Sequence, residues 1–539
     1  MPTLPTLALL DQVPIFADLS AEDRTALAGE LETVEILRGG VLVHEGDPAD
    51  AMYIVASGRF SVMIAARAHA IAEIGPGQPI GEIAFLTQDR RTATVRALRD
   101  SLVLKLDRKA FDAITAKSPR LWQTLASTLA RRVAAANKVQ GPPPEPQPRT
   151  IAIIQAGPRP IPDAFIKRLH QAFQAQADTL LLDAQRMAQR LPSGTSLDSG
   201  EATARLNAAE AEAEHVLYVA DQTLTPWSER VLRQADLVLA IGWHSADPAL
   251  SELEDRARTF LTGQDMRLVL LHEARSQIFG TARWLDKRPG QPHHHVALDD
   301  PTTIDRLVRF VRGTARGLVA CGGGAFTPAH IGVMAALTEK NITFDLVGGT
   351  SGGSAMAAAF AQGRTPDDIS AGIEEIFVSG RAMRRYTWPL YSLIDHRHFD
   401  DLLKAHYGTL DIEDLWVPYF AVSTNLSTNQ LHKHTRGPLW RAVRASSSIP
   451  VLLPPVFTDE GHMLVDGCLI DNVPIRLMQE TKSGPNVVVA FELPRIDRFD
   501  VNYDDLPGRN TVLKAKFVRW RAPELPNAPG IGTVLMRSL

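Results

Sequence analysis

The sequence predicts a multidomain chain in three parts: an N-terminal β jelly roll, an α/β middle region and an α/β region at the C-terminal end. Short apolar strands separated by turn residues fill the first part, as in barrels and jelly rolls. Longer apolar runs alternating with polar, helix-like stretches fill the rest, as in parallel α/β folds. A proline-rich segment at residues 141–148 separates the two patterns, because it favours neither a helix nor a sheet ladder. We expect these parts at residues 1–138, 139–150 (the linker), 151–314 and 315–539.

Composition and charge limit the classes of function. The chain has 539 residues and a formal net charge of −4, which gives no reason to expect nucleic acid as a partner. Its two cysteines, Cys321 and Cys468, imply no disulfide framework and favour a reducing compartment. The sequence shows neither a secretory leader nor a run of about 18 apolar residues. We therefore expect a cytoplasmic protein with at most peripheral membrane contact.

Strands and turns alternate in the N-terminal part. The predicted strands cover residues 51–55, 59–64, 92–97 and 102–106. Turn signals such as Ser57-Gly58 lie between them. The part ends in a predicted amphipathic helix with apolar side chains at helical spacing: Leu121, Leu125, Leu129 and Val133.

The middle region contains apolar runs of the kind that strands buried on both faces show. They cover residues 151–154, 179–182, 215–219, 237–241 and 268–271. With the polar stretches between them they predict a parallel sheet covered by helices. His293, His294 and His295 follow a proline, and we expect them in a solvent-exposed loop rather than in a metal site. No metal ligand is predicted elsewhere.

A catalytic corner is predicted at the run Gly349-Thr350-Ser351-Gly352-Gly353, which has the form G-x-S-x-G. It follows an apolar, strand-like stretch and precedes a helix-like one. Gly349 and Gly353 allow a sharp turn that would expose Ser351 on the corner between strand and helix. The helix N-terminus would direct free N–H groups and its positive dipole end toward developing negative charge. We therefore expect Ser351 to be a nucleophile.

Two further features complete this constellation. Gly322, Gly323 and Gly324 follow an apolar strand and precede a helix, so their N–H groups could form an oxyanion hole. Asp466 ends another apolar strand and could accept the proton of Ser351. Each feature alone is also common in ordinary loops and turns, but their order along the chain favours catalysis.

The spacing of these glycine-rich turns does not fit two nucleotide-binding motifs. A dinucleotide fingerprint starting at Gly322 would need a glycine where Thr327 stands, and neither glycine-rich turn has the lysine of a P-loop. A histidine-assisted triad is the mechanistic alternative, and His330 fits a packing role better than a catalytic one. Its candidate histidines are His330, His396, His398, His432 and His434.

From about residue 317 to about residue 473 the chain resembles the patatin-like phospholipases. The segments 444–450 and 466–474 are also similar to that family. The resemblance implies a Ser–Asp dyad in which Ser351 is the nucleophile and Asp466 the base, with oxyanion donors at Gly322, Gly323 and Gly324 and no cofactor for catalysis. Phe326 and Thr327 depart from the family pattern, which usually has a basic residue and a glycine there. Activity would then be reduced, or the substrate less anionic.

A second site is predicted in the N-terminal part. Gly81-Glu82 opens a short predicted helix whose N–H groups can face a phosphate, Arg91 supplies a positive charge, and Glu82 can accept a ribose hydroxyl. This part resembles the cyclic-nucleotide-binding domains. The resemblance implies a phosphate-binding cassette, with cAMP or cGMP as a regulatory ligand, formed by Gly81, Glu82, Arg91, Thr92 and Ala93. The alternative is a fold retained without a ligand.

Both parts together resemble neuropathy target esterase and its bacterial relatives. Residues 221–227 and 233–236 are similar to the region that those proteins place between sensor and hydrolase. The resemblance implies hydrolysis of phospholipids or lysophospholipids, with the lipid as partner and the oligomeric state open. Two alternatives remain: a catalytically weak, nucleotide-responsive binding protein and a soluble esterase of non-lipid substrates.

Overall fold

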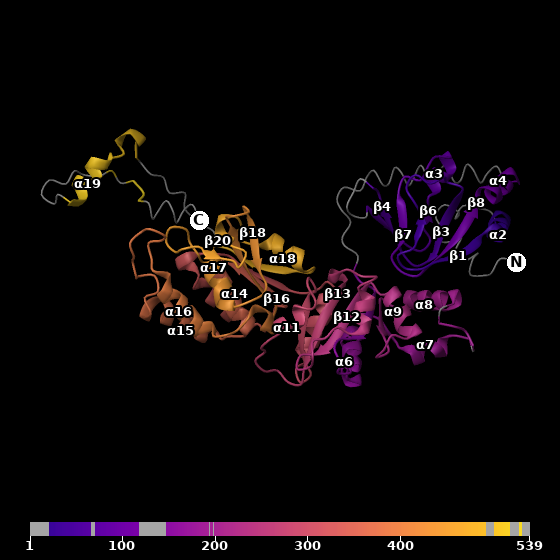
Figure 1. The fold of residues 1–539 in the computed structure, drawn as a ribbon, viewed down its shortest axis with the longest axis horizontal. Helices are drawn as coiled ribbons and strands as arrows, with labels where there is room; N and C mark the ends of the chain where they lie inside the picture. The colour runs from indigo at the N-terminus through magenta and orange to yellow at the C-terminus, as the bar shows by residue number, and fades with distance from the viewer. Residues whose placement is uncertain are drawn as a thin grey trace. The chain divides into compact units, whose positions relative to one another are not determined.

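The computed structural model describes residues 21–65, 71–117, 147–192, 194–197, 199–491, 501–517, 526 and 528–530. The chain forms two compact units (Figure 1). Unit 1 comprises Met1–Ser276 and Arg283–Arg312, and unit 2 comprises Gln277–Ala282 and Gly313–Leu539. The predicted linker lies largely outside the described residues, as does the predicted helix with Leu121, Leu125, Leu129 and Val133.

The N-terminal part of unit 1 is a β domain of two antiparallel sheets, which confirms the predicted fold class. The sheets have the strand orders β1-β8-β3-β6 and β2-β7-β4-β5. Alternating apolar side chains such as Ile54 and Phe60 fill its two cores. Its elements are α2 Ala21–Glu30, β1 Glu32–Ile36, β2 Val41–Val43, β3 Ala51–Ser57, β4 Phe60–Met63, β5 Ala72–Ile74, β6 Pro79–Ile80, α3 Glu82–Thr87, β7 Thr94–Ala97, β8 Ser101–Asp107 and α4 Arg108–Lys117.

The middle part of unit 1 is a parallel α/β layer, as predicted. Its six-stranded sheet has the order β10-β11-β9-β12-β13-β14. Both faces of the sheet are covered by apolar cores, which explains the continuous apolar runs. Its elements are β9 Thr150–Gln155, α6 Asp163–Gln174, β10 Thr179–Leu182, α7 Ala184–Arg190, α8 Gly200–Glu212, β11 His215–Val219, α9 Pro226–Gln234, β12 Leu237–Trp243, α10 Glu252–Ala257, η1 Gly263–Asp265, β13 Met266–His272, α11 Ala282–Leu285, β14 His293–Ala297 and α12 Pro301–Val311.

The expectation for the three consecutive histidines was wrong. His293–Ala297 forms the edge strand β14, and His294 and His295 are buried rather than exposed in a loop. His295 pairs with Leu270 of β13, and its ring nitrogen lies 3.0 Å from that of His272. Three polar residues after a proline predict a loop, but here they form a strand because β13 pairs with it and α12 covers it. In the described ranges, no group of three or more His, Cys, Asp or Glu side chains is placed to hold a metal ion.

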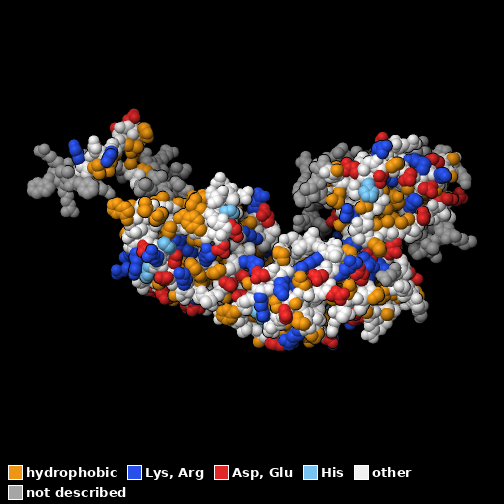
Figure 2. Space-filling view, viewed as in Figure 1, with side chains coloured by type: hydrophobic (Ala, Val, Ile, Leu, Met, Phe, Trp, Pro, Cys, Tyr) orange, Lys and Arg blue, Asp and Glu red, His pale blue; other side chains and the backbone are white. Residues whose placement is uncertain are grey.

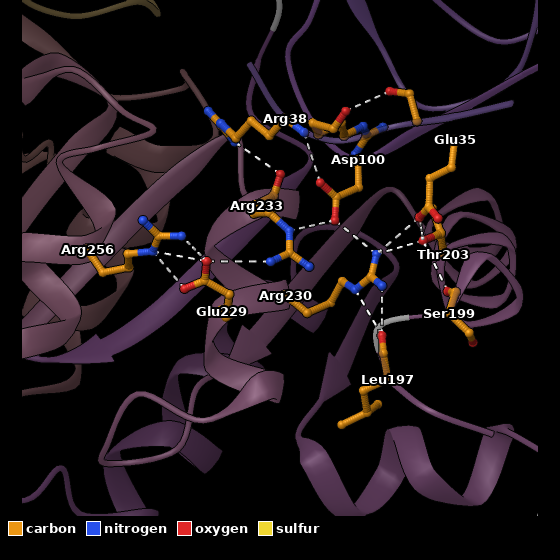
Figure 3. A network of polar contacts seen from close by, with 12 residues as sticks. Glu35, Arg38, Asp100, Leu197, Ser199, Thr203, Glu229, Arg230, Arg233 and Arg256 are labelled. Carbon is orange, nitrogen blue, oxygen red and sulfur yellow. Dashed lines mark hydrogen bonds and ion pairs between the residues drawn. The ribbon is translucent and has the colours of Figure 1, made fainter. Parts of the chain in front are cut away.

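Within unit 1, buried ion pairs join the β domain to the α/β layer (Figure 3). Asp100, in the turn between β7 and β8, is fully buried. Its carboxylate accepts hydrogen bonds from Arg230 Nη1 at 2.9 Å and Arg233 Nε at 2.8 Å, both on α9. The Arg38 backbone N–H donates to it as well, at 3.0 Å. Because Asp100 is buried with two guanidinium groups, the two parts of unit 1 share one desolvated polar contact.

Unit 2 is a mixed α/β layer, again as predicted. Its sheet has the order β19-β20-β17-β16-β15-β21, with β18 paired to β17. The central strands are parallel, and β18 and β20 run antiparallel to β17. Helices pack against this sheet (Figure 1). The elements are β15 Gly317–Ala320, η2 Gly324–Phe326, α13 Ala329–Glu339, β16 Leu346–Thr350, α14 Gly352–Gln362, α15 Pro366–Ile373, η3 Glu374–Ser379, α16 His396–Tyr407, η4 Ile412–Asp414, β17 Tyr419–Asn425, β18 Gln430–His434, α17 Leu439–Ser446, β19 Val456–Phe457, β20 Met463–Asp466, η5 Gly467–Leu469, α18 Ile475–Thr481, β21 Asn486–Val489, η6 Tyr503–Asp505 and α19 Arg509–Phe517.

Candidate active site

Ser351 lies on the corner between β16 and α14. Its backbone has φ 54° and ψ −130°, an unusual conformation for a residue with a side chain. The neighbouring glycines are required by close packing. A Cβ on Gly349 would lie 2.6 Å from Gly353, and a Cβ on Gly353 would lie 2.3 Å from the Cys321 carbonyl oxygen. The turn therefore has room only for hydrogen atoms at these two positions.

Ser351 and Asp466 are in direct contact. Ser351 Oγ donates a hydrogen bond to Asp466 Oδ2 at 2.6 Å. The other carboxylate oxygen accepts the Cys468 N–H at 3.0 Å. Both side chains are buried, Ser351 at 7% and Asp466 at 0% relative exposure. Burial raises the pKa of Asp466, and the hydrogen bond from Ser351 opposes that shift in part.

A polar segment behind the corner holds both groups. The Ser351 N–H donates to Ser446 Oγ at 2.9 Å, and Ser446 Oγ donates to the Val422 carbonyl oxygen at 2.6 Å. The Asp466 N–H donates to the Ser448 carbonyl oxygen at 2.9 Å. From the sequence, residues 444–450 are notable only for their resemblance to the patatin-like phospholipases. The structure shows the physical role of this segment, which is to fix the backbone of Ser351 and of Asp466.

Arg444 anchors the same segment from its buried side. Its guanidinium donates to Asp400 Oδ1 at 2.7 Å and to Ser448 Oγ at 2.6 Å. Arg444 is 1% exposed, so these bonds replace the water that the charge has lost. The cation therefore belongs to the scaffold of the site, and its side chain is turned away from solvent.

The glycine loop lies against Ser351. A Cβ on Gly322 would lie 2.9 Å from the Cβ of Ser351. The Gly322 N–H is directed at the Asn472 carbonyl oxygen, 3.3 Å away, and the Asn472 side chain donates back to Gly322 at 3.2 Å. The N–H groups of Gly323, Gly324 and Gly352 have no acceptor in the described part of the chain. Among the three predicted glycines, Gly323 and Gly324 thus offer open donors, whereas Gly322 is engaged.

Thr327 adds a polar group that the sequence did not assign to the site. Its side chain is 9% exposed, and Oγ1 has no hydrogen-bond partner among the described residues. A Cβ on Gly352, the residue after Ser351, would lie 2.0 Å from this oxygen. The threonine hydroxyl therefore packs against the backbone of the nucleophile corner. Phe326 beside it is 65% exposed.

The five histidines considered for a triad make their contacts with other groups. His330 Nδ1 lies 3.0 Å from the Thr327 carbonyl oxygen, and His398 Nε2 lies 2.6 Å from that of Gly380. His434 Nε2 lies 2.8 Å from Ser423 Oγ on β17. The other two candidates are His396 and His432. In the described structure none of the five histidines is hydrogen-bonded to Ser351 or Asp466.

The second predicted site places Gly81 and Arg91 together. Gly81, with φ 73°, precedes α3, and Arg91 Nη1 donates to its carbonyl oxygen at 3.0 Å. The other terminal nitrogen donates to the Ala51 carbonyl oxygen. Arg91 is buried, has no carboxylate ion pair among the described residues, and its Nε lacks a partner. Glu82 begins α3, whereas Thr92 is exposed and Ala93 is half-buried. Within the part of the chain that the structure describes, this arrangement leaves a buried guanidinium with no carboxylate in ion-pair contact.

Comparison with known proteins matches each part of the chain to a family. Residues 318–478 match the patatin-like phospholipase family. Residues 33–118 match the cyclic nucleotide-binding domain, and residues 147–318 match the neuropathy target esterase family P-loop like domain. In the described part of the chain, no helix has the length and apolar character needed to cross a membrane.

Individual relatives agree with these matches. The chain is 30% identical over 530 residues to patatin-like phospholipase domain-containing protein 7 of Rattus norvegicus, across 88% of this chain and 39% of the relative. It is 29% identical over 556 residues to neuropathy target esterase sws of Drosophila melanogaster, across 93% of this chain and 39% of the relative. The chain thus spans well under half the length of these relatives. One similar solved structure is the regulatory domain of Toxoplasma gondii PKA with cAMP, at 28% identity and a TM-score of 0.20, covering 20% of this chain and 43% of that one.

The fold and the family matches give the chain a patatin-like phospholipase domain preceded by a cyclic nucleotide-binding domain. More particularly, the chain combines these two domains with a neuropathy target esterase P-loop like domain between them. The resemblance stated from the sequence is thereby confirmed.

Proposed function

We propose that the chain hydrolyses the carboxylic ester bonds of phospholipids or lysophospholipids through a Ser351–Asp466 dyad. The observation that carries the proposal is the 2.6 Å hydrogen bond from Ser351 Oγ to Asp466 Oδ2 at a strained strand–helix corner. The family match supplies the lipid ester as the substrate class. The open N–H groups of Gly323 and Gly324 supply the donors that an oxyanion needs.

In the first step, Ser351 Oγ attacks the ester carbonyl carbon while its proton moves to Asp466 Oδ2. Because a serine hydroxyl is far more basic than a carboxylate, attack and proton transfer are concerted. The raised pKa of Asp466 makes the carboxylate more basic, so its basicity lies closer to that of the serine hydroxyl. The carbonyl oxygen becomes an oxyanion held by the backbone donors, and loss of one such donor costs about 3–4 kcal/mol of barrier.

Collapse of this intermediate breaks the bond to the alcohol oxygen of the lipid. The proton on Asp466 passes to that oxygen, and an acyl-Ser351 remains. Water then attacks the acyl carbonyl and gives its proton to Asp466. Collapse of the second intermediate returns the proton to Ser351 Oγ and releases the fatty acid, so the enzyme ends as it began.

The test compares the wild-type chain with Ser351→Ala and Asp466→Asn. We expect both variants to lose hydrolysis of lysophosphatidylcholine, and a fluorophosphonate probe to label the wild-type chain at Ser351 only. Wild-type turnover in either variant would refute the dyad. Absence of labelling would instead favour a catalytically weak binding protein. Turnover of short p-nitrophenyl esters without turnover of the lipid would favour an esterase of non-lipid substrates.

The β domain is proposed to bind a cyclic nucleotide through Gly81, Glu82, Arg91, Thr92 and Ala93. Its support is the buried Arg91, which has no carboxylate partner among the described residues and lies against Gly81 at the start of α3. The ligand is cAMP or cGMP, and titration with both decides between them. Rates of lysophosphatidylcholine hydrolysis with and without each nucleotide test regulation.

A cytoplasmic site of action is proposed because Cys321 and Cys468 are both unpaired.

A further inference from the structure

Unit 2 carries a loop whose base is buried and whose tip is exposed. We call residues 381–395 the aromatic loop. Ala382 and Ile394 at its base are buried in the core of the unit. The large side chains of the tip are between 72% and 85% exposed, and they are Tyr386, Trp388, Leu390 and Tyr391. Four neighbouring large side chains in this state form an unusual concentration of apolar surface, which typically marks an interaction site.

The exposed tip has a defined backbone. The Thr387 N–H donates to the Leu393 carbonyl oxygen at 2.9 Å, and the Asp395 N–H donates to that of Arg385 at 2.8 Å. Tyr386 and Ile394 form a short antiparallel bridge across the base. These bonds hold the two arms of the loop together, so the aromatic side chains are presented outward by an ordered turn.

The aromatic loop is hydrogen-bonded to residues that directly follow the polar segment 444–450 behind the corner. The N–H groups of Leu393 and Ile394 donate to the carbonyl oxygens of Val451 and Leu452, at 2.8 and 3.0 Å. These residues come shortly after Ser448, whose carbonyl oxygen holds the Asp466 backbone. Further apolar side chains near these elements are exposed. Val451 comes just after the segment 444–450, Leu469 and Ile470 follow Asp466, and Phe326 follows the glycine loop. Figure 2 shows hydrophobic side chains gathered on this unit, with Lys and Arg side chains near them.

The charge of the loop indicates what it contacts. Arg381, Arg384 and Arg385 are exposed, and the one acidic residue of the loop is Asp395 at its end, which caps α16. In the described part of the chain none of the three arginines forms an ion pair. Trp and Tyr favour the boundary between lipid tails and water, and arginine is attracted to anionic head groups. A second copy of the chain fits less well, because a two-fold contact would bring the same arginines together.

We propose that the aromatic loop docks unit 2 on a lipid surface that contains anionic head groups. The tip side chains enter the interface between head groups and tails, and the three arginines contact phosphates. The proposal rests on the proposed lipid hydrolysis for its purpose. The loop is hydrogen-bonded to Val451 and Leu452, close in sequence to the Ser448 carbonyl oxygen that holds the Asp466 backbone, so docking there would bring the lipid surface to the elements that carry the proposed dyad.

The experiment uses the full chain with Ser351→Ala, so that no lipid is consumed during the measurement. Co-sedimentation is measured with phosphatidylcholine vesicles, with and without phosphatidylglycerol. We expect Arg384→Gln with Arg385→Gln to weaken binding to the anionic vesicles about 30-fold, since each arginine near such a surface contributes about fivefold. We expect Trp388→Ala with Leu390→Ala to weaken binding to both kinds of vesicle by at least about tenfold.

Matched controls lie at the opposite end of the same sheet. Arg316 and Ile342 are exposed near the amino ends of β15 and β16, so Arg316→Gln and Ile342→Ala should leave vesicle binding unchanged. With Ser351 intact, the loop variants should keep their turnover of a soluble p-nitrophenyl ester, which shows that the fold is preserved.

Three outcomes would overturn the docking proposal. They are vesicle binding by both loop variants equal to that of the parent chain, equal losses in the control variants, and a loop variant that halves the mass of the chain in solution. The last result would show that the loop joins two copies. Failure of the proposed hydrolysis is read separately, from lysophosphatidylcholine turnover by the chain with Ser351 intact, because vesicle binding requires no turnover.

Discussion

Two buried carboxylates in this chain should respond in opposite ways to the same substitution. Asp100 and Asp466 are both fully buried. Asp100 binds two guanidinium groups, from Arg230 and Arg233, of which Arg230 is itself 1% exposed (Figure 3). In the described structure no cation pairs with Asp466, which accepts hydrogen bonds from a hydroxyl and a backbone N–H. The negative charge on Asp100 therefore stabilises the fold by neutralising buried arginines. The negative charge on Asp466 destabilises the fold, because it is buried without a cation.

The perturbation is Asp100→Asn compared with Asp466→Asn. Removal of one partner from a buried ion pair destabilises by about 3–5 kcal/mol. Asparagine keeps an acceptor oxygen, and Arg233 retains Glu229 at 3.5 Å. We therefore expect Asp100→Asn to cost about 3 kcal/mol, at the lower end of that range. Asp466→Asn should cost no more than about 0.5 kcal/mol or should stabilise, because it removes an uncompensated buried charge.

Hydrogen exchange of the full chain reads the two units separately. Loss of protection is expected in β1 and β8 for Asp100→Asn, with little change in β17 and β20 for Asp466→Asn. The dependence of stability on pH gives a further check on Asp466. Since its native pKa is raised above 3.8, the stabilising contribution of its protonated form is present below the unfolded pKa and is lost as pH rises through the native pKa. Equal destabilisation by both substitutions would refute this reasoning.

Three further predictions concern activity and ligand binding. Thr327→Val should lower kcat by on the order of tenfold to a hundredfold with little change in KM, and Thr327→Ser should restore it, if the unpaired hydroxyl stabilises the oxyanion; equal kcat in all three chains would exclude that role. The kcat/KM for a soluble ester should rise with pH through the raised pKa of Asp466, because the base must be ionised, and a profile flat from acid to neutral pH would contradict the assignment. Arg91→Lys should weaken cAMP or cGMP binding about tenfold to a hundredfold in a titration with a fluorescent analogue, since a charge-assisted pair of bonds is lost, and unchanged affinity would exclude Arg91 as the phosphate ligand.

Local patterns in the sequence predicted the fold class and the two motifs that meet in unit 2. Gly349 and Gly353 could be placed because a strand–helix corner leaves a recognisable glycine spacing around the serine. The parallel layers could be predicted because strands covered on both faces leave continuous apolar runs. In each case the sequence signal lies within one short stretch of the chain and needs no knowledge of its distant partners.

Features that depend on distant partners could not be predicted in this way. Asp100 looks like a surface turn residue until α9 brings Arg230 and Arg233 to it from 130 and 133 residues away. The buried state of His294 depends on helix α12, whose Phe310 ring lies 4.7 Å from its own. The engaged N–H of Gly322 depends on Asn472, at a separation of 150 residues. No local periodicity records such pairs.

The structure also gives a physical reason why the proposed Ser351–Asp466 dyad needs no histidine to orient Ser351. In a triad, a third group holds the base and the base holds the serine. Here Cys468 N–H holds one oxygen of Asp466 while Ser351 bonds the other. His434 faces Ser423, which is paired in register with Asp466, but burial lowers the pKa of His434 to about 3, so it stays neutral. The backbone of Ser351 is fixed separately by Ser446, which opposes relaxation of a conformation that costs about 1–3 kcal/mol. The orientation of Ser351 thus depends on several short contacts around the corner, and in the proposed mechanism the Asp466 carboxylate has only to move the proton.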